Sequence, residues 1–147
     1  MRMRIAAAVA ALALSPVAFA DCTVEIEVGD SLSYNTSAIE VPASCENVTV
    51  NIKHTGSLPA AAMGHNWVLA ADADWQDIAN KGAAAGVAGN FLPTGDDRII
   101  AATKLIGGGE TDSITFSTAT IDAGGSYTFF CSFPGHWSVM KGSFKLV

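Results

Sequence analysis

The chain of 147 residues is 50% hydrophobic and 15% charged, and its formal net charge at neutral pH is −6. This length suits one ordinary domain that buries a core of its own. The excess of acidic residues argues against nucleic acid as a partner, because proteins bind the phosphate backbone through clustered Lys and Arg.

The first twenty residues have the order of a secretory signal peptide. Arg2 and Arg4 precede an apolar run over residues 5–14, and a small-x-small pattern ends at Ala20. The run is shorter than the about 20 residues of a membrane span. We therefore expect cleavage after Ala20 and no membrane insertion of the mature chain, with a retained anchor helix as the alternative. Removal of the two arginines lowers the formal charge by two, to −8.

Most of the mature chain, residues 21–147, has the alternation of apolar and polar residues that predicts strands. The alternating or strand-like segments are residues 23–28, 48–54, 111–117, 126–132 and 142–147. Such segments, separated by Gly, Pro, Asn and Asp, are typical of an all-β sandwich or barrel.

One segment departs from this pattern. Residues 72–82 contain helix formers, acidic residues in the first turn and a terminal glycine, which together predict a short inserted helix. The Ala- and Gly-rich stretch that follows, up to Pro93, is predicted to be a loop.

Three cysteines are an odd number for an exported chain. In an oxidising compartment two cysteines pair, and the third needs a separate explanation. The simplest partition is a disulfide between Cys22 and Cys45 and a free Cys131. A free cysteine is commonly a buried, inert thiol, so the neighbours of Cys131 decide its interpretation.

Those neighbours include two further metal-binding side chains. Cys131, His136 and Met140 lie within ten residues, and His65 lies far upstream. Two histidines and a cysteine in one plane, with a long axial methionine, are the blue-copper electron-transfer arrangement. Thiolate and thioether favour Cu(I), whereas imidazole accepts both oxidation states.

Two other kinds of chemistry use some of the same residues. Zinc accepts the same nitrogen and thiolate ligands, and it stays an alternative. A cysteine near a histidine can also act as a nucleophile with its base, but the turn between them supplies no oriented third group. The joint pattern therefore predicts a metal site.

The motifs resemble those of the azurins, the bacterial periplasmic branch of the cupredoxins. The resemblance covers essentially the whole mature chain and rests on residues 63–69 (MGHNWVL), 103–107 (TKLIG), 129–136 (FFCSFPGH) and 140–142 (MKG). It implies a cupredoxin-like Greek-key sandwich with one type 1 copper, located in the periplasm and transferring single electrons.

The resemblance also implies a role for each ligand. His65, Cys131 and His136 would be equatorial ligands of copper. Met140 would lie at a long axial distance, with the backbone carbonyl of Gly64 on the opposite side.

Further roles follow from the same resemblance. Asn66 would tie the two ligand loops together near the cysteine sulfur, and Phe133 would lie beside the ligands. Cys22 and Cys45 would form the disulfide of the family. Hydrogen bonds to the metal-bound sulfur raise the reduction potential by lowering its electron donation.

A partner surface is expected around the exposed edge of His136. It would consist of apolar or small residues that flank the ligand loops, namely Leu58, Met63, Pro134, Gly135 and Trp137. Trp137 departs from the small residue usual in azurins. Exposed apolar patches mark interaction sites, and the resemblance implies weak, transient contact with c-type cytochromes, copper nitrite reductase or amine dehydrogenases by a monomer.

These observations favour a periplasmic electron carrier. It would not be an enzyme, because a copper with closed coordination leaves a substrate nowhere to bind. A periplasmic copper carrier or storage protein is the alternative, although it would favour more than the three His and four Met present here. A metal-free interaction module is a third possibility, and it predicts no role for Cys131.

Overall fold

The computed structural model describes residues 21–147, so the predicted signal peptide and its cleavage site lie outside the described residues. No helix within 21–147 has both the length and the hydropathy needed to cross a membrane. The strands and helices are β1 (Thr23–Val28), β2 (Ala38–Val41), β3 (Asn47–His54), α1 (Ala60–Met63), β4 (Val68–Ala71), α2 (Trp75–Gly82), β5 (Ala101–Ala102), β6 (Thr111–Ser117), β7 (Tyr127–Phe130) and β8 (Lys141–Leu146).

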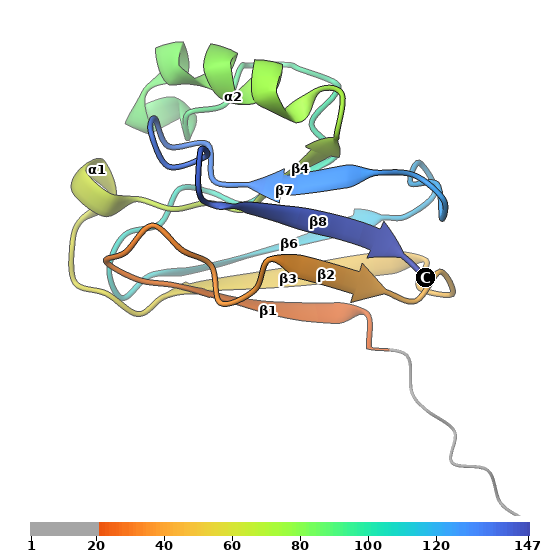
Figure 1. Cartoon of the computed structure of the whole chain (residues 1–147). Coiled ribbons are helices and arrows are strands. Elements are labelled where there is room, and N and C mark those ends of the chain that lie inside the picture. Colours follow the sequence, from red (N-terminus) through yellow and green to blue (C-terminus); the bar gives the residue numbers. More distant parts are fainter. Residues whose placement is uncertain (1–20) are drawn as a thin grey trace, which may run out of the picture.

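The strands form two packed sheets, which confirms the predicted β-sandwich. One sheet has the order β1-β3-β6 and the other the order β2-β8-β7-β4-β5. Helix α2 lies over the outer side of the second sheet, above β4 and β7, and α1 lies at one end of the sandwich (Figure 1). Two single-turn 3₁₀ helices, Ala83–Ala85 and Val87–Gly89, follow α2.

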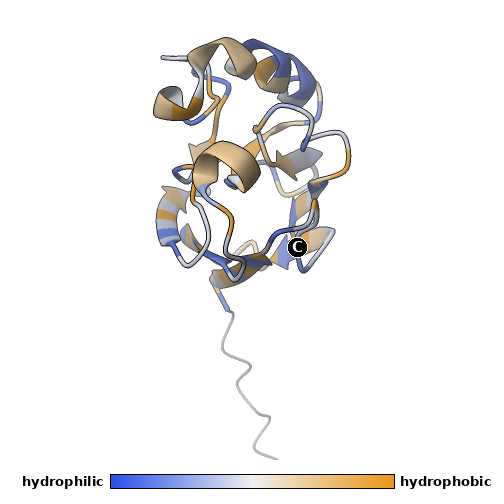
Figure 2. Ribbon diagram, turned by 90° about the vertical axis from the view of Figure 1, so that its left-hand side faces the viewer, coloured by the Kyte–Doolittle hydropathy of each residue, from blue (hydrophilic) through white to orange (hydrophobic). Residues whose placement is uncertain are grey.

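The core lies between the sheets because each long strand buries one of its two faces. Strand β3 buries every second residue from Val48 to His54, and β1 pairs with it in parallel. The alternation is visible as bands of contrasting hydropathy along the strands when the molecule is viewed from the α1 end (Figure 2). Trp67 lies fully buried in this core.

Two predicted elements are shorter in the structure than in the sequence interpretation. Strand β7 ends at Phe130 because the next backbone N–H groups find other partners, and the N–H of Ser132 donates to a side chain, Asn66 Oδ1, at 2.9 Å. Helix α2 begins at Trp75 because Asp72 is still held by the sheet, its N–H donating to Ser126 O and its carboxylate accepting from Thr128.

Three short strands and the single-turn helix α1 were not predicted. Strand β4 lies under α2 and over the core, so its first three residues are all buried and show no alternation. Strands β2 and β5 and helix α1 have four residues or fewer, which is too short for a period to be read from the sequence.

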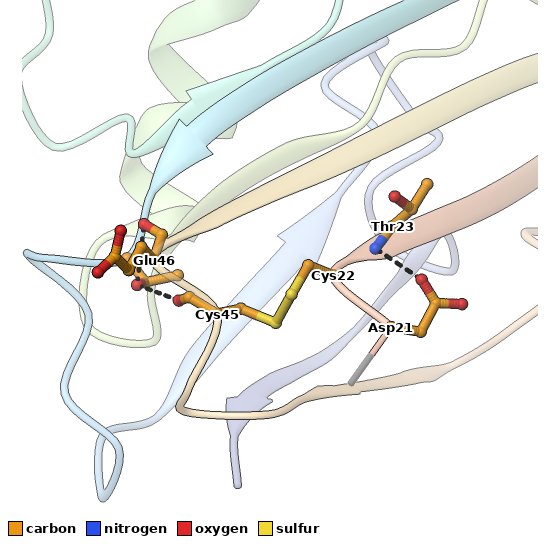
Figure 3. Close-up of a disulfide and its surroundings, with 6 residues drawn as sticks. Asp21, Cys22, Thr23, Cys45 and Glu46 are labelled. Atoms are coloured by element: carbon orange, nitrogen blue, oxygen red, sulfur yellow. Dashed lines mark hydrogen bonds between the residues drawn. A yellow bond between two sulfur atoms is a disulfide. The ribbon is translucent and has the colours of Figure 1, made fainter. Parts of the chain in front are cut away.

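The predicted disulfide is present. Cys22 and Cys45 are bonded across a separation of 23 residues, which joins the start of β1 to the turn before β3 (Figure 3). Thr118 donates to the carbonyl oxygen of Cys45 at 2.6 Å and so attaches this turn to the end of β6. The remaining cysteine, Cys131, is free and buried.

Candidate metal centre

Two chain segments meet at the end of the sandwich near α1. His65 lies between α1 and β4, and two backbone hydrogen bonds of 3.0 and 2.8 Å pair it with Ile106. Cys131 directly follows β7 and Met140 directly precedes β8. The N–H of Cys131 donates to Met140 O at 3.1 Å, so the β-hairpin closes the loop that carries His136.

Hydrogen bonds within the loop 131–140 set its shape. The N–H of His136 donates to Phe133 O at 2.9 Å, and His136 O accepts from the N–H of Met140 at 2.8 Å. Gly135 lies in this turn at φ 83°, a conformation that is easy only for glycine. The Pro-Gly pair therefore folds the chain back so that His136 faces Cys131.

Three possible ligand atoms converge in this region. Cys131 Sγ lies 3.8 Å from His65 Nδ1 and 3.8 Å from His136 Nδ1. The three ligand atoms lie within 4.8 Å of one another, and all three residues are buried. Gly64 O is 4.0 Å from the same sulfur.

These separations fit a trigonal metal site. Bonds of about 2.1 Å to nitrogen and about 2.3 Å to sulfur, spread at about 120°, place the two atoms roughly 3.8 Å apart. Both sulfur-to-nitrogen distances in the structure have this value. The residues present therefore fit one copper ion of the type 1 class.

The histidines are held in the form that binds a metal. His65 Nε2 lies 2.8 Å from Gly29 O, and because a carbonyl only accepts, Nε2 carries the proton and Nδ1 presents its lone pair to Cys131. Burial lowers the pKa of His65. It also lowers the pKa of His136 to about 4, with a further contribution from His65.

This shift predicts an acid-sensitive metal-free protein. The unfolded chain takes up a proton at His136 near pH 6.5, whereas the folded protein does so only near pH 4. The unfolded state therefore binds more protons in this window, and the free energy of unfolding should fall as the pH drops from about 6.5 to about 4. Measured by urea unfolding across this pH range, the free energy of unfolding of His136→Gln should fall less steeply with decreasing pH than that of the unmodified chain. Equal dependence on pH in the two proteins would contradict the lowered pKa of His136.

The cysteine is the buried group whose proton a metal must displace. Burial raises the pKa of the Cys131 thiol to about 11, while backbone N–H groups of Asn66 and Phe133 hydrogen-bond to it and act in the opposite direction. Metal binding to such a thiol releases its proton. The same two N–H groups face the sulfur atom that would bind the metal.

Asn66 joins the two ligand segments. Its Oδ1 accepts from the N–H of Ser132 at 2.9 Å, and its Nδ2 donates to Ser132 Oγ at 2.8 Å. Tyr34 donates its hydroxyl to Asn66 O at 2.6 Å, and burial raises the pKa of this phenol, which keeps its proton in place. Asn66 is fully buried, so these bonds are shielded from competition by water.

Met140 and Gly64 flank the three ligand residues. Met140 is 1% exposed, and it bonds through its backbone to both Cys131 and His136. Gly64 is a close-packing position, because an added Cβ would overlap Ala60 O and lie 2.9 Å from the side chain of Leu105. A glycine is therefore required directly before His65.

The residues of the expected partner surface differ in exposure. Pro134 and Gly135 are exposed, Leu58 is 41% exposed, and Met63 is partly buried. Trp137 is also partly buried, because its ring packs edge-on against Trp75 of α2 with the ring centroids 5.9 Å apart.

Sequence reasoning missed three residues around the ligands. Ser132 accepts from Asn66, Asn90 accepts from both of these residues, and Phe91 packs against Phe133 with the ring centroids 4.9 Å apart. Asn90 and Phe91 belong to the segment predicted only as a loop, and nothing in their spacing indicates which side chains they contact.

The comparisons with known proteins agree with this geometry. Residues 20–147 match the family model described as copper binding proteins, plastocyanin/azurin family. The chain is 53% identical to an azurin of Bordetella pertussis over 90% of this chain and 89% of that protein. It is also 53% identical to an azurin of Pseudomonas fluorescens biotype C, over 86% and 99% of the respective chains.

A solved structure shows the same fold. The azurin Az-iso2 of the obligate methylotroph Methylomonas sp. strain J superposes with a TM-score of 0.83 at 48% identity, covering 87% of this chain and 99% of that one. This likeness confirms the cupredoxin fold that the resemblance implied. The chain belongs to the plastocyanin/azurin family of copper-binding proteins.

Proposed function

We propose that this protein is an exported electron carrier that binds one copper ion through His65, Cys131 and His136. The observation that carries the proposal is the convergence of one buried sulfur and two buried imidazole nitrogens at trigonal spacing. Copper bound there would supply a one-electron couple between Cu(II) and Cu(I).

The protein would contribute a rigid set of ligands. His65 is held by Gly29 and Ile106, and Cys131 by Met140. Because these contacts lie in the buried part of the site, the ligand positions need not rearrange when an electron arrives or leaves. Small rearrangement is what fast electron transfer requires.

Met140 and the Gly64 carbonyl are proposed as weak axial ligands. Their place beside the three ligand residues, the burial of Met140 and the azurin relationship support this assignment. Met140→Leu should retain copper and raise the reduction potential, because an axial donor that tunes the potential is lost. Cyclic voltammetry checks the change with Val139→Leu as an exposed neighbouring control, and a lowered potential would contradict the axial role.

We further propose that the protein is not an enzyme and that it acts by brief contact with redox proteins. All the ligands are supplied by the chain, and His136 is 6% exposed. The surface of Leu58, Met63, Pro134, Gly135 and Trp137 would receive c-type cytochromes, copper nitrite reductase or amine dehydrogenases. Weak redox encounters use small interfaces, which agrees with a monomer.

The proposed location is the periplasm, after cleavage at Ala20. The Cys22–Cys45 disulfide supports an oxidising compartment, and the family match begins at residue 20. Mass spectrometry of the exported protein should find Asp21 at the new N-terminus.

One experiment tests the function. The full chain is expressed in a bacterial host with a periplasm, the exported protein is purified, and Cu(II) is added while the visible spectrum is recorded. An intense blue band that ascorbate bleaches and an oxidant restores supports the carrier. The absence of a band rejects it, and rapid loss of copper to a chelator would favour copper delivery or storage instead. Metal analysis of the purified protein detects any competing zinc.

A further inference from the structure

The loop after α2 reaches the ligand segments through two residues with unusual backbone conformations. Asn90 has φ 54° and Phe91 has φ 50°. Residues other than glycine seldom adopt these values, and a bulky residue does so only at a cost. Hydrogen bonds stabilise this arrangement, since the N–H of Phe91 donates to Gly86 O at 2.9 Å and that of Asn90 to Val87 O at 3.0 Å.

The left-handed turn aims the backbone carbonyl of Asn90 at both ligand segments. Asn90 O accepts from Asn66 Nδ2 at 3.1 Å and from Ser132 Oγ at 3.0 Å. The side chain of Asn90 is used as well, because its Oδ1 accepts from the N–H of Leu105 at 2.9 Å. Asn66 directly follows one histidine ligand and Ser132 directly follows the cysteine, so one carbonyl oxygen joins the two segments.

Phe91 supports the third ligand through its ring. It packs edge-on against Phe133 with the centroids 4.9 Å apart, and Phe133 stacks on the His136 ring with the centroids 4.2 Å apart. The backbone of Phe91 is fixed from the other side by Gly82 at the end of α2, where an added Cβ would overlap Phe91 O. Helix α2 therefore sets the position of Phe91.

We propose that Asn90 and Phe91 are positioning residues for the copper site, held in a strained left-handed conformation so that they fix Asn66, Ser132 and Phe133 against the ligands. The inference rests on the proposed function. Strained backbone of this kind persists only where the surrounding structure over-determines it, and it concentrates at functional sites. Here the strained residues contact both ligand segments.

A specific consequence concerns the cysteine sulfur. The backbone N–H groups that face it belong to Asn66 and Phe133, which are the residues that Asn90 and Phe91 contact. Hydrogen bonds to a metal-bound thiolate lower its electron donation and raise the reduction potential. Displacing either positioning residue should therefore weaken these bonds and favour the oxidised protein.

Two variants displace the pair by independent routes. Asn90→Val introduces a β-branched residue that disfavours positive φ, whereas Asn90→Gly keeps the backbone conformation and its carbonyl. Gly82→Ala pushes on the carbonyl of Phe91 without changing either positioning residue. Val87→Ala is the exposed control in the same loop, and Ile121→Ala is a control that destabilises the core by loss of a buried side chain.

Two measurements decide the outcome. In the metal-free protein, hydrogen exchange at the Asn66 and Phe133 amides should be faster in Asn90→Val and Gly82→Ala than in Asn90→Gly. In the copper-loaded protein, the equilibrium constant for reduction should fall about fivefold in Asn90→Val and in Gly82→Ala, as expected for one lost hydrogen bond. Both controls should keep the potential of the unmodified protein.

The inference is overturned if Asn90→Val and Gly82→Ala keep the potential and the amide protection while losing thermal stability as Ile121→Ala does. If Asn90→Val does not fold, the same measurements on Gly82→Ala alone decide whether the positioning role is rejected. Absence of a blue band in the unmodified protein would instead reject the proposed function, and the amide measurement would still test the positioning role.

Discussion

Cys131→Ser is expected to abolish the intense blue absorption of the copper-loaded protein. Serine keeps the size and burial of the side chain, but a buried hydroxyl gives up its proton far less readily than a thiol whose pKa is already raised to about 11. The variant would therefore offer copper two imidazoles and a neutral oxygen. Visible spectra after addition of Cu(II) check the result, with Ser138→Ala as a control at an exposed position of the same loop.

The remaining affinity of Cys131→Ser is informative as well. His65 Nδ1 and His136 Nδ1 still face the former sulfur position, so the variant should bind Cu(II) as a weakly coloured complex that a chelator removes quickly. An intense blue band in Cys131→Ser would show that the colour arises elsewhere and would reject the assigned site.

Trp67→Ala is expected to cost about 3–5 kcal/mol of unfolding free energy, the range for deleting a buried aromatic side chain. The Trp67 ring is fully buried and lies 6.0, 6.1 and 6.4 Å from the rings of Phe116, Phe129 and Phe144, centroid to centroid. Removing it leaves a cavity between the two sheets, and the cost depends on how far the surrounding side chains can fill it. Urea unfolding of the metal-free protein gives the value, because bound copper would add its own stabilisation.

Two comparisons sharpen this prediction. Trp75→Ala removes a partly buried tryptophan on the outer side of the second sheet and should cost clearly less. Trp67→Phe should also be milder, since Trp67 Nε1 has no hydrogen-bond partner among the described residues and its loss leaves no polar group unpaired. A cost below about 1 kcal/mol for Trp67→Ala would mean that the core repacks.

The long strands were predictable because one face of each meets the core. In β3 the burial of alternate residues follows directly from the pleat. Strand β4 escaped prediction for the opposite reason, since the core on one side and α2 on the other bury successive residues. Periodicity reveals an element only when its two faces meet different surroundings.

The ligand residues could be identified from residue type and spacing because their chemistry is local. Cys131, His136 and Met140 occupy one hairpin loop. A short loop has few possible conformations, so the spacing of these residues already indicates that their side chains lie close together. The pairing of this loop with His65 was also predicted from residue type, and the structure now gives the distances. A site residue whose contribution is a backbone group, such as Gly64, had no chemical signature in the sequence.

By itself, the sequence determined the β-sandwich fold class, the pairing of Cys22 with Cys45 that leaves Cys131 free, and which side chains can bind a soft metal. Only the tertiary structure decided how the ligands are held. Asn90 and Phe91 act through a carbonyl oxygen and a ring placed by left-handed backbone conformations, and neither property follows from residue identity. Contacts between segments far apart in the chain depend on how the sheets and α2 pack, so they appear only when the whole domain is assembled.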